Sequence, residues 1–79
     1  MQLEYKPEAV KQLKKLPLLQ KKKIIKKLEL LSQNPHSGKT LRGELVGLRS
    51  LRAWPYRIIY EIQNRTIIIF SIVHRQSAY

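Results

Sequence analysis

The pattern of apolar and polar positions predicts a short strand and then a helix at the start of the chain. Residues 2–6 alternate in the manner of a strand. Pro7 suits the first turn of a helix, and Pro17 ends that helix or begins the next one. One apolar stripe recurs at a spacing of three along this helix, which we expect to be about ten residues long. The stripe consists of Val10, Leu13 and Leu16.

A second helix is expected from about Leu18 to Gln33. Asn34 precedes Pro35, and because the residue before a proline avoids the helical region, the helix ends there. The two helices together form a helical hairpin. The buried stripe of the second helix is expected to consist of Ile24, Ile25, Leu28 and Leu31, with Leu30 as a further member.

The second half of the chain changes to a period of two, which is typical of strands. Glycine, serine and proline make residues 36–44 a loop. Three runs of apolar, β-branched and aromatic residues follow, and Trp54-Pro55 and then Asn64 with Arg65 separate them. The three predicted strands are residues 48–54, 56–63 and 66–74. The last run is apolar on both faces, so we expect it to lie inside the sheet.

These elements predict an α+β fold that forms one domain over residues 1–79. An N-terminal strand and the helical hairpin pack on one face of a mainly antiparallel four-stranded sheet, and the other face stays open. A chain of 79 residues has apolar surface for a single core and little more.

The predicted hairpin around Trp54-Pro55 carries the first candidate chemistry. If the turn is centred on these two residues, Arg52 lies opposite Arg57 on the open face, and Leu51 lies opposite Ile58 on the core face. Like charges that face each other across a ladder destabilise a sheet, whereas two adjacent guanidinium forks suit a phosphate. The alternative is a pair of independent arginines that simply face solvent.

Net charge narrows the choice of partner. Sixteen Lys and Arg against five Glu give +11, which indicates nucleic acid, an anionic membrane or an acidic protein. Eight lysines and no acid lie between residues 11 and 27, and this imbalance favours a steering field for RNA over a merely solvated face. No apolar run can span a bilayer and the N-terminus lacks a signal-peptide core. We therefore expect a cytoplasmic protein with no membrane partner.

The C-terminal residues form a second candidate cluster. Arg75 offers a cation, Tyr79 a phenol, and His74 an imidazole, the side chain best suited to proton transfer near neutral pH. Whether His74 or Arg75 shares the open face depends on a one-residue choice of register at Asn64 and Arg65, which the sequence leaves open. A lone histidine at a strand end is more often structural than catalytic.

Several other chemistries lack the residues that they need. The chain has no cysteine, no aspartate and two histidines, so it offers neither a carboxylate cluster for Mg²⁺ nor a zinc site. It has no glycine-rich phosphate loop. We therefore expect no metal and no cofactor. Any phosphoryl transfer must then be catalysed by arginine, lysine, tyrosine and histidine side chains. The substrate's own 2′-hydroxyl is then the natural nucleophile, which requires RNA.

With these residues considered, the sequence resembles the RelE/ParE superfamily of bacterial and archaeal type II toxins over nearly its whole length. The resemblance implies the fold described above and a tightly bound antitoxin that masks the basic surface. It also implies a joint role in repressing the operon, in which operator DNA is bound indirectly through the antitoxin. The segments that carry the resemblance are residues 9–16 (AVKQLKKL), 34–43 (NPHSGKTLRG), 48–62 (LRSLRAWPYRIIYEI) and 74–79 (HRQSAY).

The resemblance implies two targets. RelE-like members enter the ribosomal A site and cleave mRNA without metal, leaving a 2′,3′-cyclic phosphate and a 5′-hydroxyl. ParE-like members share the fold but poison DNA gyrase and usually lack the ribonuclease residues. We expect the first activity, an endoribonuclease. A plain RNA- or DNA-binding module is a third hypothesis, but Trp54 is expected in a turn and Phe70 in a buried strand, so an exposed aromatic platform is missing.

The resemblance also implies four catalytic side chains. Arg57 is expected to hold the scissile phosphate, and Arg75 to stabilise charge or the leaving oxygen. Tyr79 is expected to stack on a base or to assist proton transfer, and Arg52 matches a recurrent basic position before the turn.

One departure from the RelE pattern lies on the strand before the turn. Some RelE members carry further lysines there, whereas this chain has Leu48 and Ser50. We consider Lys39, Arg42 and Arg49 as substitutes. The full set of residues expected to bind RNA is Lys22, Lys26, Lys39, Arg42, Arg49 and His74.

Overall fold

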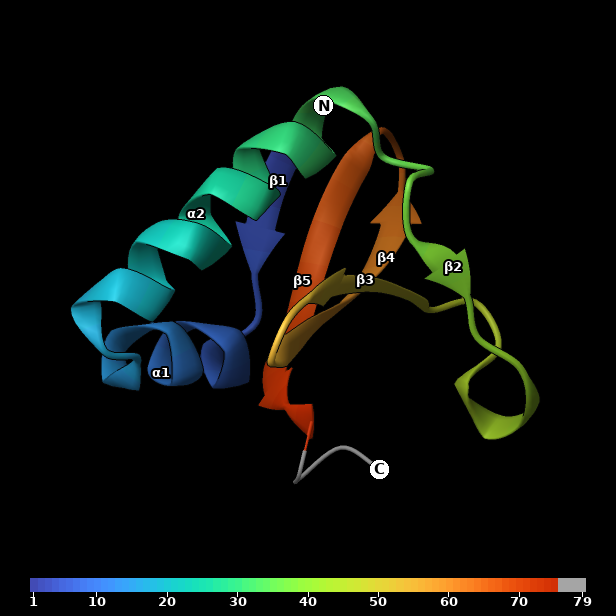
Figure 1. Ribbon diagram of the computed structural model, residues 1–79. Helices are drawn as coiled ribbons and strands as arrows, with labels where there is room; N and C mark the ends of the chain where they lie inside the picture. The colour runs from blue at the N-terminus through green and yellow to red at the C-terminus, as the bar shows by residue number, and fades with distance from the viewer. Residues whose placement is uncertain (76–79) are drawn as a thin grey trace.

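Two helices lie on one side of a five-stranded sheet in the computed structural model, which describes residues 1–75 (Figure 1). The strand order across the sheet is β1-β5-β4-β3-β2. In chain order the elements are β1 (Gln2–Tyr5), α1 (Pro7–Lys15), α2 (Leu18–Gln33), β2 (Lys39–Thr40), the 3₁₀ helix η1 (Gly43–Leu45), β3 (Arg49–Ala53), β4 (Tyr56–Gln63) and β5 (Thr66–His74).

The sheet confirms the α+β class and corrects the number of strands. β1 runs parallel to β5, and the other three pairings are antiparallel. The expected count of four strands is wrong because β2 adds a fifth, which pairs through Lys39 with Ser50 and through Thr40 with Arg49. The sequence predicted a loop over residues 36–44 and missed this strand, because two exposed polar residues show no alternation of apolar and polar positions.

The helices begin and end where the prolines predict. Pro7 lies in the first turn of α1, and α2 ends at Asn34, whose backbone N–H donates to the Leu30 and Leu31 carbonyl oxygens. Part of the stripe expected on α2 is wrong, since Ile25 is 41% exposed and Leu30 is 53% exposed. A helix lying on a sheet buries positions i, i+4 and i+7. The residues of α2 that are buried at this spacing are Ile24, Leu28 and Leu31.

The core lies between the helices and the near face of the sheet. Ala9 of α1 is fully buried there, although its small side chain had not marked it as a core residue. A register shift between Ile59 and Tyr60 changes which residues of β5 face the core, so that Ile69 and Ile72 both do. β5 has a neighbouring strand on each side, as expected from its apolar sequence. Within residues 1–75, no helix is long and apolar enough to cross a membrane.

Candidate anion-binding site on the open face of the sheet

The register of the β3–β4 hairpin is the one that the sequence predicts. Arg52 pairs with Arg57, and Leu51 pairs with Ile58. Because directly opposed residues in an antiparallel ladder point to the same face, both arginines lie on the face opposite the helices, which we call the open face. Ile58 is fully buried on the other face. Two guanidinium groups are thus neighbours on adjacent strands.

Strand β2 brings a third cation to the same face. Lys39 pairs with Ser50, and Ser50 lies two residues from Arg52 on β3, so all three share the open face. The Arg57 Nη1 atom donates a hydrogen bond to the Ser50 hydroxyl oxygen at 3.3 Å. These residues surround a space of about 300 Å³, which we call the basic cavity. Its lining consists of Ser37, Lys39, Ser50, Leu51, Arg52 and Arg57.

The basic cavity is an electrostatic site for an anion. Its described lining contains three cationic side chains, two hydroxyls and no carboxylate. Arg57 is half-buried and Arg52 is exposed, so an anion that enters from solvent meets one fixed and one more mobile guanidinium. A guanidinium presents a planar fork of donors that matches two phosphate oxygens.

The buried side chain of Tyr60 anchors the segment that lines one side of the basic cavity. The Tyr60 hydroxyl donates to the Pro35 carbonyl oxygen at 2.7 Å and accepts from the Gly38 backbone N–H at 3.0 Å. The Arg49 Nη1 atom donates to the Gly38 carbonyl oxygen at 3.1 Å. These bonds hold residues 35–38, which include Ser37 of the lining, and Lys39 is positioned by its pairing with Ser50.

The Tyr60 contact depends on close packing at Gly38. A Cβ atom at Gly38 would lie 2.5 Å from the Tyr60 hydroxyl oxygen and 3.0 Å from the Ser50 carbonyl oxygen. Burial raises the pKa of Tyr60, while the Gly38 hydrogen bond and the charge of Arg49 act in the opposite direction. Sequence reasoning missed this arrangement, because Tyr60 looks like an ordinary core aromatic and Gly38 like an ordinary loop residue.

The structure resolves the register that the sequence left open at the C-terminal cluster. His74 pairs with Tyr56, and their rings meet edge to face with centroids 5.2 Å apart. His74 therefore shares the core-side face and not the open face. Arg75 lies at the hairpin turn, where its guanidinium carbon is 4.5 Å from the Trp54 ring centroid. Tyr79 lies outside the described residues.

The remaining expected RNA-binding residues do not join the basic cavity. Arg42 is exposed just before η1, and Arg49 is engaged with Gly38. Lys22 and Lys26 are exposed on α2.

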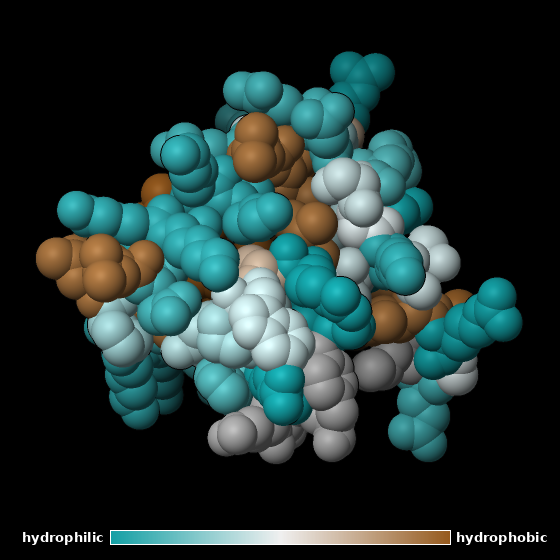
Figure 2. All heavy atoms as spheres, in the orientation of Figure 1, coloured by the Kyte–Doolittle hydropathy of each residue, from teal (hydrophilic) through white to brown (hydrophobic). Residues whose placement is uncertain are grey.

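The helical lysines form a separate basic region, which we call the lysine surface. Hydrophilic side chains cover much of the helices on the face seen in Figure 2. Lys23 ties the lysine surface to the hairpin through a hydrogen bond from its ammonium group to the Trp54 carbonyl oxygen. The lysine surface consists of Lys11, Lys14, Lys15, Lys21, Lys22, Lys23, Lys26 and Lys27.

Fold and site define a small basic α+β protein with a cation-lined cavity on the open face of its sheet. A family model described as the ParE toxin of the type II toxin-antitoxin system, parDE, matches residues 3–79. The chain belongs to this family, within the RelE/ParE superfamily that its sequence resembles, and is a toxin of a type II toxin–antitoxin system. No curated protein gives a significant match to the sequence.

Solved structures of both branches of the superfamily share this fold. The RelBE2 toxin–antitoxin complex of Mycobacterium tuberculosis contains a chain with 32% identity and a TM-score of 0.86, and the match covers 94% of this chain and 96% of that one. The RelB–RelE complex of Methanococcus jannaschii gives 26% identity and a TM-score of 0.78, over 96% and 94%.

A ParE-type structure has the same architecture. The chromosomal ParDE system of P. aeruginosa gives 20% identity and a TM-score of 0.76, over 94% of this chain and 95% of that one. This identity supports the fold alone. Because RelE-type and ParE-type proteins have the same fold, the target of this toxin must be argued from its site.

Proposed function

We propose that this toxin is a ribosome-dependent endoribonuclease that cleaves mRNA in the A site and so inhibits translation. The observation that supports the proposal is the basic cavity, where Lys39, Arg52 and Arg57 converge from three strands. Like charges gathered this closely destabilise the sheet. A site that binds a phosphate and stabilises the further negative charge of its transition state accounts for that cost.

The proposed reaction is transesterification within the RNA. The 2′-hydroxyl oxygen attacks the adjacent phosphorus and loses its proton, while the bond from phosphorus to the 5′-oxygen breaks and that oxygen gains a proton. The products are a 2′,3′-cyclic phosphate and a 5′-hydroxyl. Arg57, held by Ser50, binds the non-bridging oxygens, and Arg52 and Lys39 neutralise the charge that accumulates on them.

Residues at the C-terminus complete the proposed site. Arg75 stands at the hairpin turn, at the end of the sheet where Arg52 and Arg57 lie, and in the proposal it stabilises charge on the leaving oxygen. Tyr79 stacks on a base or assists proton transfer, as the family resemblance implies. His74 faces Tyr56, which favours a supporting role over direct proton transfer.

The partners follow from the charge of the whole molecule. The lysine surface is proposed to meet ribosomal RNA, with Lys22 and Lys26 among its exposed members. A cognate antitoxin is proposed to mask the basic surfaces and to link the toxin to operator DNA. The similar chains from M. tuberculosis and M. jannaschii were solved as toxin–antitoxin complexes, which supports such a partner.

Primer extension on a defined mRNA with stalled ribosomes tests the activity. We expect cuts within the A-site codon that end in a cyclic phosphate, and we expect the Arg57→Ala variant to lose them. Arg65→Gln, which removes a charge from the exposed β4–β5 turn, is the matched control and should cut normally. Intact mRNA with wild-type protein would refute the proposal.

A ParE-like gyrase inhibitor without catalysis is the second candidate. It is favoured by the family model, whose description names the ParE toxin. A supercoiling assay with purified gyrase separates the two candidates. Loss of supercoiling and appearance of DNA breaks, with mRNA left whole, would establish this alternative.

A further inference from the structure

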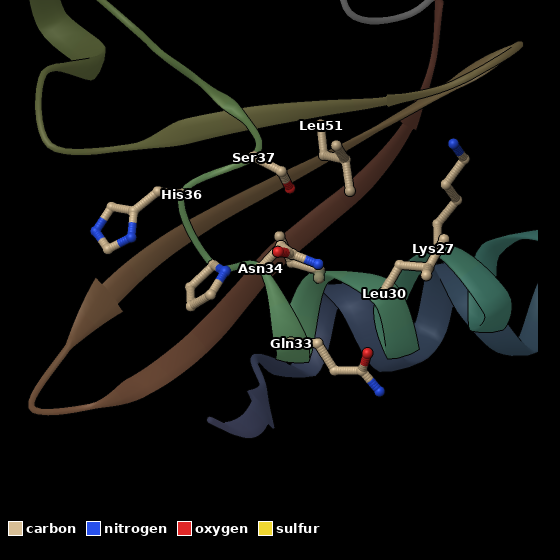
Figure 3. Close-up of a pocket in the computed structure, with 9 residues that line it drawn as sticks. Lys27, Leu30, Gln33, Asn34, His36, Ser37 and Leu51 are labelled. Atoms are coloured by element: carbon tan, nitrogen blue, oxygen red, sulfur yellow. The ribbon is translucent and has the colours of Figure 1, made fainter.

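A second cavity, which we call the side cavity, lies directly beside the basic cavity. It has a volume of about 550 Å³, within the range of about 300–1,000 Å³ found for small-molecule sites. It lies between the C-terminal end of α2, the segment 34–37 and strand β3 (Figure 3). Ser37 and Leu51 line both cavities, so a ligand in one is adjacent to a ligand in the other.

The edge of the sheet allows one strand of RNA to reach both cavities. β2 pairs with β3 only at Arg49 and Ser50, so β3 continues past the end of β2 at Leu51 and Arg52. No described strand covers that part of β3 on this side. The two cavities meet at Ser37 and Leu51, so an extended ligand at this edge can contact both of them.

The side cavity combines apolar walls with polar groups. In Figure 3, Leu51 and Ser37 point from the strand and the loop toward Asn34 at the end of the helix, and Leu30 lies beside them. Leu30 is 53% exposed, so an apolar surface is presented to whatever enters. Within residues 1–75, the side-chain amide of Asn34 makes no hydrogen bond. The amide can therefore pair with a ligand.

We propose that the side cavity binds a nucleobase next to the scissile phosphate and that Asn34 selects adenine there. This inference rests on the proposed ribonuclease activity and adds a base-recognition site to it. Leucine side chains pack against the flat face of a base, and single-stranded RNA bases are read by hydrogen bonds along their edges. An amide pairs in bidentate fashion with N6 and N7 of adenine. Continuity with the basic cavity makes the base and the phosphate parts of one RNA strand.

The test is a cleavage profile on stalled ribosomes whose A-site codons differ only in the bases that flank the cut. We expect the wild-type protein to prefer adenine at one flanking position by about tenfold, the discrimination of one bidentate contact. Asn34→Leu keeps the size of the side chain and should abolish the preference. Asn34→Asp should shift it toward cytosine, because a carboxylate accepts from N4 of cytosine. Gln63→Leu, an exposed amide at the end of β4, is the matched control and should keep the wild-type profile.

Each outcome decides the inference. A change of preference in Asn34→Asp cannot come from a folding defect, since misfolding lowers all cuts together, and it would support the site. If both Asn34 variants still cut with the wild-type base profile, the inference would be overturned while the proposed ribonuclease activity would stand. A peptide would then be the ligand to test for the side cavity. A wild-type profile with no preference at either flanking base would do the same. Absence of any cutting by wild-type protein would overturn the proposed activity and the inference with it.

Discussion

The lysine surface and the basic cavity carry the same kind of charge in two different ways. On the helices, lysines repeat along exposed faces, and most of their ammonium groups lie at the ends of flexible stems in solvent. In the cavity, three cations come from three separate strands, and the ladder register fixes the positions of their backbone atoms. Arg57 is further fixed by its hydrogen bond to Ser50. Positive charge is thus diffuse in one region and more closely positioned in the other.

Because of this difference, we expect the two regions to have different roles. Exposed charges attract an RNA over a Debye length of about 8 Å at physiological ionic strength, which raises the association rate and weakens with salt. Positioned charges in a partly buried site stabilise one arrangement of a phosphate, which lowers a reaction barrier. Variants of the cavity should therefore change the rate of cleavage, and variants of the helices should change binding.

The strongest test of this division is replacement of Arg57. We expect Arg57→Ala to lower the rate of cleavage on ribosomes by about 10²–10³-fold, comparable to the loss of one oxyanion donor. Arg57→Lys retains the charge but not the planar fork, and it should recover only part of the loss. Single-turnover cleavage with saturating ribosomes measures the rate, and sedimentation measures ribosome binding. Equal losses of cleavage rate and of ribosome binding would contradict the separate roles of the basic cavity and the lysine surface.

Gly38→Ala should have the next largest effect on cleavage and stability, because Gly38 lies between the basic cavity and the buried side chain of Tyr60. The new Cβ would lie 2.5 Å from the Tyr60 hydroxyl oxygen, and such overpacking costs about 1–3 kcal/mol. We expect a lower free energy of unfolding in urea and slower cleavage together. In a Tyr60→Phe background the nearest clashing atom is absent, so the added cost of the alanine should be smaller. Simple additivity of the two substitutions would argue against the contact.

The pH dependence of stability tests the same tyrosine with a smaller effect. Burial raises the pKa of Tyr60 above its ordinary value of 10.0, so folding favours the neutral phenol. Its contribution to stability is therefore complete below pH 10.0 and is lost as the pH rises through the higher folded value. We expect the wild-type free energy of unfolding to fall above pH 10.0 and Tyr60→Phe to fall less steeply.

Tyr5 provides the control for that measurement. Burial also raises the pKa of Tyr5, so Tyr5→Phe should remove its own share of the alkaline slope. The double variant should show the flattest profile of the four proteins. If Tyr60→Phe left the fall in the free energy of unfolding above pH 10.0 unchanged, the pKa of Tyr60 would not be raised by folding.

The parts of the site that the sequence predicted are those governed by local rules. Trp54-Pro55 marks the turn and the period of two marks the strands, so the pairing of Arg52 with Arg57 follows from adjacent residues. The phenol of Tyr60 could not be anticipated in the same way, since it bonds residues 22 and 25 positions away. No local periodicity reports such a contact.

The predictions that were wrong, left open or incomplete have similar causes. Ile25 and Leu30 fit a helical stripe, but the sheet covers a narrower face of α2 than the stripe assumed. The register of His74 depended on a β-bulge at Ile59 and Tyr60, and a bulge shifts every later side chain by one position. Lys39 was expected to bind RNA from a loop, and its place in the cavity required the unpredicted strand β2.

The smallest expected effect, and the one that most directly tests the diffuse region, belongs to Lys22→Gln combined with Lys26→Gln. Each lost phosphate contact lowers the log–log salt slope of binding by about 0.7 for single-stranded RNA, so the pair should lower it by about 1.4. Ribosome affinity should fall a few-fold at low salt and hardly at all at high salt. Cleavage by the saturated complex should keep its rate, because neither lysine lines the basic cavity. If the double variant instead cleaved slowly at saturation, the helices would take part in placing the phosphate, and the two basic regions would form one site.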